Sequence, residues 1–285
     1  MHTMKKTLIA IAAFFCTISA FAWNDMGHAT VAAIAEKHLS HSAAKAVKEY
    51  LGDKSMVLSA SDADYCRAIW TLDLGFVPSN PEASQPDWII ELDRTLPKNI
   101  AVFAHMFTVD QDFNPYPDSN LNGKYIQNAV WEIAILADKL KKNAKNMDPV
   151  ERQRDLLLLI HLVGDIHCPS HITYKPFTGQ PGTITVAGRK GTFHHYWDAS
   201  PEWGSWSFSD LAGELDNASV KEMKEISAGS PYDWGKDSAK SCYEVNQVKT
   251  GDSFHKSKVV EFRALSFSQL RKAGYRLAAI LNDIF

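Results

Sequence analysis

Residues 148–167 place the strongest constraint on the fold of this chain, because they read as one helix whose apolar part, 156–166, carries two ionisable groups. Asp148, Pro149 and Glu151 form a typical helix start, with a capping side chain, a proline in the first turn and an acidic partner for the cap. The leucine-rich stretch that follows is expected to stay helical until just before Pro169. A helix this apolar must be buried against other elements.

Two ionisable side chains interrupt this apolar helix. His161 and Asp165 lie at positions i and i+4, so both point from one face. One such pair is more often a hydrogen bond on a helix surface, but a buried Asp165 would be costly without a cation. His194 and Asp198 repeat the spacing in FHHYWD, and His171 follows just after the apolar helix. Two such pairs favour a metal such as zinc, which binds imidazole nitrogen and carboxylate oxygen together.

The other histidines lack this context. His38, His41 and His255 have no aspartate at a matching offset in a helical pattern, and they are expected at the surface. His167 and His195 adjoin the two pairs but are off their spacing. We expect these two to support a ligand or to face solvent.

The rest of the chain predicts further helices around one short hairpin. Helical spacing of apolar residues, or residues that start and stop helices, occurs at 28–38, 42–51, 57–71, 124–142 and 259–284. Residues 78–122 are rich in Pro, Asn and Asp and are expected to form long loops, with one extended piece at 102–109. A hairpin is expected at 183–187 and from 192 onward. Since no repeat or linker divides the chain, it predicts a single, mainly α domain over residues 23–285.

Residues 1–22 have the features of a signal peptide. Lys5 and Lys6 precede the apolar run 8–15, and Ala20 and Ala22 fit a small-residue cleavage site. The apolar run is shorter than the roughly 20 residues that a membrane-spanning helix needs. We therefore expect cleavage after Ala22, a mature chain without a transmembrane segment, and a periplasmic or secreted location.

The net charge and the cysteine count limit the interactions that this chain is expected to make. The chain has 30 basic and 33 acidic residues, a net charge of −3, so its side chains give no general attraction for nucleic acid. Removal of the signal peptide leaves three cysteines, Cys66, Cys168 and Cys242. Export permits disulfides, but with an odd number at least one thiol stays unpaired within a monomer, and the pairing is open.

The order of these residues along the chain resembles the S1/P1 nuclease family. The pattern consists of Trp23, Gly27-His28, Asp64-x-x-Arg67, His105, His161-x3-Asp165, His171 and His194-x3-Asp198. The C-terminal AGYRLAAILNDI is also similar to the last helix of that family. The resemblance implies a helical domain of the zinc phospholipase C and P1 nuclease type, which holds three Zn²⁺ ions.

The resemblance also implies a role for each matching residue. Three sets of ligands are expected: Asp64, His105, His161 and Asp165; then Trp23 and His28 with Asp165 as a bridge; then His171, His194 and Asp198. The second set would use the α-amino nitrogen and carbonyl oxygen of Trp23, because an amine with a pKa of about 7.7–8 readily gives up its proton to a metal. Asp64, Arg67 and Asp165 would be catalytic, Arg67 by holding a phosphate oxygen; its alternative is an ordinary salt bridge.

The sequence departs from the family pattern at two places. Cys168 stands where a polar residue such as glutamine is usual, and TGQPGT at 178–183 replaces a Gly-Gly-Asn segment. Both departures are expected along the rim of the substrate site. Met106 or Phe107 is expected either to stack on a base or to pack in the core.

The function implied is a secreted, zinc-dependent phosphodiesterase. It would hydrolyse single-stranded DNA and RNA to 5′-phosphorylated products and would also act on nucleotides as a 3′-nucleotidase. Three divalent ions against three carboxylates would leave a local positive charge that the net charge conceals. Two alternatives remain at this point, a zinc-dependent phospholipase C and an inactive zinc-binding protein. No stable protein partner is implied.

Overall fold

The structure is a computed structural model of the chain. It describes residues 23–65, 105–116, 118–119, 125–126, 129–174, 181–199 and 206–285. Among these residues, no helix is both long enough and apolar enough to cross a membrane.

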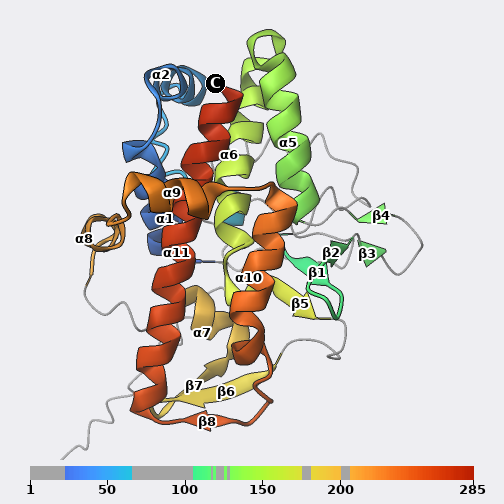
Figure 1. Cartoon of the computed structure of the whole chain (residues 1–285), viewed down its shortest axis with the longest axis vertical. Helices are drawn as coiled ribbons and strands as arrows, with labels where there is room; N and C mark the ends of the chain where they lie inside the picture. Colours follow the sequence, from blue (N-terminus) through green and yellow to red (C-terminus); the bar gives the residue numbers. More distant parts are fainter. Residues whose placement is uncertain are drawn as a thin grey trace, which may run out of the picture.

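Helices make up most of the described structure, as predicted. The α-helices are α1 (Asp25–Lys37), α2 (His41–Leu51), α5 (Ala129–Asn143), α6 (Pro149–Asp165), α7 (Phe193–Ala199), α8 (Phe208–Leu215), α9 (Val220–Ser227), α10 (Pro231–Asn246) and α11 (Lys256–Ile284). Three short 3₁₀ helices are η1 (Asp62–Tyr65), η2 (Ala144–Asn146) and η3 (Pro169–His171). The longest helix, α11, runs along most of the long axis of the molecule, and α6 lies beside it in the interior (Figure 1).

The predicted helix starts and stops follow ordinary capping chemistry. The Asp148 carboxylate accepts from the backbone N–H groups of Val150 and Glu151, with Pro149 in the first turn of α6. Ser40 caps α2, and Gly52 ends it with a φ of 64°, a conformation that favours glycine. These parts of the sequence-based prediction are confirmed.

Three parts of the helix prediction need correction. The helix expected at 124–142 begins only at Ala129, because Tyr125 and Ile126 form a short strand. Residues 57–71 were expected to be helical, but residues 57–65 form turns and the 3₁₀ helix η1, and the remainder lies outside the described residues. Helices α8, α9 and α10 were not predicted. Each begins with a capping box, Ser207 with Asp210, Ser219 with Glu222, and Ser230 with Asp233, which is the signal that could have identified them.

The strands form small sheets at the side and one end of the helices (Figure 1). β1 (Phe107–Val109) pairs with β2 (Pro115–Tyr116) in antiparallel fashion and with β5 (Ile172–Tyr174) in parallel. β6 (Thr183–Val186) and β7 (Arg189–Thr192) form a hairpin, as predicted, and β8 (Ser253–Phe254) adds to it. The second strand was expected from residue 192 onward, but it ends at Thr192 and α7 follows it. β3 (Asp118–Ser119) pairs with β4 (Tyr125–Ile126). The extended piece predicted at 102–109 is confirmed for its last three residues.

The packing of α1 against α11 positions the N-terminal part of the site. Ile34 of α1 is fully buried, and Gly274 of α11 is buried opposite it. A Cβ atom on Gly274 would come within 2.6 Å of both Cβ and Cγ2 of Ile34. Because the branch point of Ile34 is fixed to its backbone, a rotamer change cannot relieve this contact, and the two helices approach closely only through glycine.

We therefore expect Gly274→Ala to destabilise the protein by about 1–3 kcal/mol, the usual cost of overpacking a core. The measurement is urea-induced unfolding followed by circular dichroism. The matched control is Gly213→Ala in α8, where an added Cβ has no neighbour within 4 Å, so that only helix propensity changes. Equal unfolding midpoints for the two variants would contradict close packing of α1 on α11.

Candidate metal centre

The site is built around two side chains of the buried half of α6. Every residue from 155 to 165 is buried, so the leucines anchor the helix in the core. On this helix His161 and Asp165 meet as predicted, with His161 Nε2 3.1 Å from Asp165 Oδ2. Neither side chain is exposed, and both therefore need partners from other elements.

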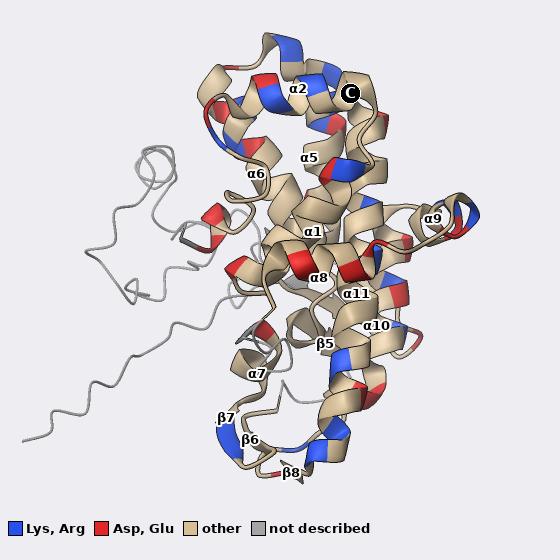
Figure 2. Cartoon of the chain, turned by 90° about the vertical axis from the view of Figure 1, so that its left-hand side faces the viewer, with Lys and Arg blue, Asp and Glu red and all other residues tan. Residues whose placement is uncertain are grey.

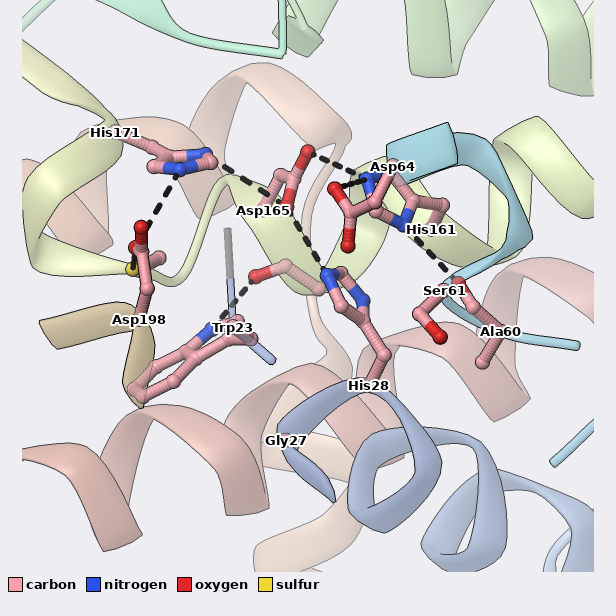
Figure 3. A network of polar contacts seen from close by, with 12 residues as sticks. Trp23, Gly27, His28, Ala60, Ser61, Asp64, His161, Asp165, His171 and Asp198 are labelled. Atoms are coloured by element: carbon pink, nitrogen blue, oxygen red, sulfur yellow. Dashed lines mark hydrogen bonds and ion pairs between the residues drawn. The ribbon is translucent and has the colours of Figure 1, made fainter. Parts of the chain in front are cut away.

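Helix α1 and the 3₁₀ helix η1 supply the first of these partners. His28 of α1 places Nε2 3.4 Å from Asp165 Oδ1, and its ring stacks on that of His161 with centroids 4.0 Å apart. Asp64 of η1 places Oδ1 3.4 Å from His161 Nε2. Asp165 thus lies between the imidazoles of two elements (Figure 3).

Glycine 164 makes the approach of His28 possible. A Cβ atom at this position would lie 2.8 Å from His28 Nδ1, closer than real Cβ contacts allow. The Gly164 carbonyl also accepts a hydrogen bond of 3.1 Å from the indole N–H of Trp23. Trp23 is fully buried, and the next backbone N–H, that of Asn24, donates to the Asp198 carbonyl at 2.9 Å. The start of the predicted mature chain therefore lies against the site.

A second group of possible ligands, His171, His194 and Asp198, lies next to Asp165. His171 of η3 places Nδ1 3.6 Å from Asp165 Oδ1 and Nε2 3.9 Å from Asp198 Oδ1 (Figure 3). His194 and Asp198 meet on α7, with 3.0 Å between Nε2 and Oδ2. The two predicted His–Asp pairs are thus joined through His171.

His105 lies in this second group. Its ring centroid is 4.5 Å from that of His171 and 6.3 Å from that of His194, and the three imidazoles can offer nitrogens within 4.8 Å of one another. The resemblance had implied that His105 binds with Asp64 and His161. Among the described residues, the group of three possible ligands that includes His105 instead contains His171 and His194. Arg67 lies outside the described residues.

The remaining histidines lie apart from these groups. His167 is buried but turned away from Asp165, because its Nδ1 contacts the Val163 carbonyl and its Nε2 accepts from Arg276. His38 is half-buried and contacts Asp216, His41 is exposed, and His255 occupies the N-cap position of α11 without a capping hydrogen bond from its side chain. Phe107 is fully buried in β1 and packs in the core rather than facing a ligand.

Burial controls the charges of the site. Burial, aided by the nearby His161, lowers the pKa of His28 to about 4, and burial lowers that of His171 to about 3. Burial raises the pKa of Asp64 to about 7 and also raises that of Asp198. Burial alone would lower the pKa of His161, but Asp165 and Asp64 outweigh it and raise that pKa well above its usual value. Asp198 likewise outweighs burial at His194 and raises its pKa, so among the described residues of the site His161 and His194 are the imidazoles that favour the charged form.

The donor atoms of the site fit a metal ion. Both oxygens of Asp165, both nitrogens of His171, and Nε2 of His28 and of His161 are buried without a hydrogen-bond partner. Among the described residues, three groups of possible ligands draw on this set: His28–His161–Asp165, His105–His171–His194 and Cys168–His171–Asp198. Imidazole nitrogen and carboxylate oxygen are ligands of zinc, and a divalent cation would satisfy atoms whose burial is otherwise costly.

One neighbour of the site was placed wrongly by the sequence analysis. Cys168 was expected at the substrate rim, but its side chain is fully buried within the site. Ser170 also lies there and donates a hydrogen bond of 3.0 Å to Asp198 Oδ1. The short connection between Asp165 and His171 could have indicated both positions. Residues 178–180 of the second departure lie outside the described residues.

Comparison with known proteins agrees with this geometry. The family model described as S1/P1 Nuclease matches residues 23–285. Endonuclease 2 of Arabidopsis thaliana is 25% identical over 304 residues, which cover 98% of this chain and 96% of that protein. Nuclease S1 of Aspergillus oryzae is 24% identical over 295 residues, covering 93% and 92%. Endonuclease 4 of Arabidopsis thaliana is 26% identical over 308 residues, covering 93% and 90%.

The family match begins at Trp23 and includes every predicted ligand. Members of this family are metal-dependent nucleases, which hydrolyse phosphodiester bonds, and the buried His and Asp groups can hold metal ions. With nearly its whole length matched, the chain belongs to the S1/P1 nuclease family.

Proposed function

We propose that the mature chain is a three-zinc nuclease that hydrolyses single-stranded DNA and RNA to 5′-phosphorylated products, with 3′-nucleotidase activity on nucleotides. The observation that carries this proposal is the convergence of His28, His161 and His171 on the buried carboxylate of Asp165. Such an arrangement suits a shared ligand between neighbouring ions. We also propose that residues 1–22 are removed on export and that the protein is periplasmic or secreted.

Three sets of residues would hold the ions. The proposed sets are Asp64, His105, His161 and Asp165; Trp23, His28 and Asp165; and His171, His194 and Asp198. When bound, the ions would polarise the phosphate and supply a nucleophile at neutral pH. Because His105 contacts the rings of His171 and His194, its assignment to the first set rests on the family resemblance rather than on its nearest neighbours.

A contact of Nδ1 with the backbone sets which nitrogen of His161 is free to bind a metal ion. Nδ1 lies 3.0 Å from the Ala60 carbonyl, which can only accept a hydrogen bond. Nδ1 is therefore the donor, and in the neutral ring Nε2 keeps a lone pair that faces Asp64 and Asp165. Since the pKa of His161 is raised by those carboxylates, a cation binding there would displace its proton.

Surface charge favours an unpaired strand over a duplex. In Figure 2, segments that carry Lys or Arg alternate with segments that carry Asp or Glu along the described helices, and the net charge is −3. A duplex needs extended phosphate contacts with basic side chains. The favourable contacts here would instead be local, between the ions and one phosphate. A base taken from a duplex would also have to leave its stack, at a cost of a few kcal/mol.

The central test is cleavage of matched single- and double-stranded oligonucleotides at equal concentration, followed by analysis of the fragment ends. We expect at least about tenfold faster cleavage of the single strands, from the cost of extruding a base, with DNA and RNA cleaved similarly and 5′-phosphates on the products. Phosphatidylcholine serves as the comparison substrate. Faster hydrolysis of that lipid, or 3′-phosphate ends, would contradict the proposed substrate and products.

Metal content tests the site itself. Elemental analysis of the mature protein should give close to three zinc ions per chain, and chelation should lower the thermal midpoint, because ions bound to the folded state stabilise it. In Gly164→Ala the added Cβ displaces His28, and the content should fall by one ion. Gly213→Ala, with no neighbour near its Cβ, is the control and should keep all ions. Unchanged zinc in Gly164→Ala would argue against His28 as a ligand.

The N-terminus gives an independent test. Mass spectrometry of the exported protein should find Trp23 as the first residue, since the α-amino group is proposed as a ligand. A variant in which Ala22 is retained before Trp23 replaces that amine by an amide, a very poor ligand, and should lose one zinc ion and most activity. Full zinc content and activity in the extended variant would rule out this use of Trp23.

A further inference from the structure

Cys168 lies inside the site, between two predicted ligands along the chain. It occupies the connection between Asp165 at the end of α6 and His171 in η3, and none of its side chain is exposed. Its thiol faces Asp198, with Sγ 3.8 Å from Oδ1, and also lies 3.1 Å from the Ser170 hydroxyl. The side chain is thus turned toward the ligands rather than toward the apolar core alone.

The positions of three donor atoms point to a common ion. Cys168, His171 and Asp198 can each offer one ligand atom within 4.8 Å of the other two. Asp198 Oδ1 lies 3.8 Å from Cys168 Sγ and 3.9 Å from His171 Nε2. Zinc bonds of about 2.0–2.3 Å at tetrahedral angles place ligand atoms roughly 3.5 Å apart. Small side-chain shifts would therefore bring all three atoms onto one ion.

A second observation is independent of the cysteine. The ring of His171 is fully buried, and neither of its nitrogens has a hydrogen-bond partner in the structure. Its Nε2 is directed toward Asp198. A buried imidazole nitrogen without a donor or acceptor is costly, and a cation between His171, Asp198 and Cys168 would remove that cost.

We propose that the Cys168 thiolate is a further ligand of the ion held by His171, His194 and Asp198. The inference rests on the proposed metal centre and extends it to a residue that the family pattern does not assign, since a polar residue such as glutamine is usual there. Binding breaks the S–H bond, forms a sulfur–metal bond and releases the proton to solvent.

This ligand would change the character of that ion. Thiolate is a soft ligand that zinc and other thiophilic metals prefer. With His171, His194 and Asp198 it completes four protein ligands, the number typical of closed zinc sites, whereas open catalytic sites keep a position for water. We therefore expect tight retention of this ion and selectivity for metals that bind sulfur.

Cobalt substitution tests the proposal directly. The mature protein is freed of zinc by chelation and loaded with Co²⁺, whose visible bands report occupancy and whose near-ultraviolet charge-transfer band reports sulfur ligation. We expect the charge-transfer band in the wild type and its loss in Cys168→Ser. The same variant should bind one of its zinc ions on the order of tenfold or more weakly, a loss of the size seen when the support of a metal site is removed.

Cys242→Ser is the matched control. Cys242 is also fully buried, but among the described residues it belongs to no group of possible ligands. This variant should keep the charge-transfer band. If the band is absent from wild type although the visible bands show bound cobalt, or if it persists in Cys168→Ser, the cysteine proposal is wrong and the metal centre stands. If no visible bands appear at all, the metal centre itself fails.

X-ray absorption of the wild-type zinc protein keeps the test decisive even where Cys168→Ser does not fold. A sulfur neighbour at about 2.3 Å from zinc would support the proposal. A zinc shell fitted only by nitrogen and oxygen would overturn it.

Discussion

The carboxylate of Asp165 is the interaction on which the arrangement of the site depends. It lies fully buried near the end of an apolar helix, and imidazoles from α1, α6 and η3 contact it at 3.1–3.6 Å. A single buried charge close to groups from three elements favours an arrangement in which those groups, or an ion between them, compensate it. The leucines of α6 bury the helix in the core, and Asp165 is the group around which the imidazoles gather.

Burial and metal binding are coupled through this carboxylate. Without a cation, Asp165 depends on the proton of His161, since the pKa values of His28 and His171 fall to about 4 and about 3. A protonated His161 cannot offer Nε2 to a metal, so metal and proton compete for the same position. The metal-free protein would therefore hold its charge balance with protons on groups such as His161, His194 and Asp64, where the loaded protein uses cations. This exchange explains how so polar a cluster can exist within an apolar helix.

The sequence was most informative where chemistry is local. His161 with Asp165 and His194 with Asp198 are fixed by helical spacing, and the start of α6 follows from its cap. Contacts between distant segments were less predictable: no local pattern indicates that His105 meets His171 and His194. The placement of Cys168 failed for another reason, because a short connection between two buried ligands was treated as surface. Helices α8 to α10 were overlooked although their capping boxes are visible in the sequence.

The proposed cleavage after Ala22 would join proteolytic processing to this polar centre. Trp23 is anchored by contacts that do not need a free amine, namely the indole hydrogen bond to Gly164 and the bond from Asn24 N–H to Asp198. These contacts can hold the segment in place whether or not residues 1–22 are attached. Cleavage would then add one ligand, the amine, to a position already set by packing. A metal site arranged in this way would be complete only after export. Because packing already orders the segment, binding of the amine to an ion would require no further loss of conformational entropy by the chain.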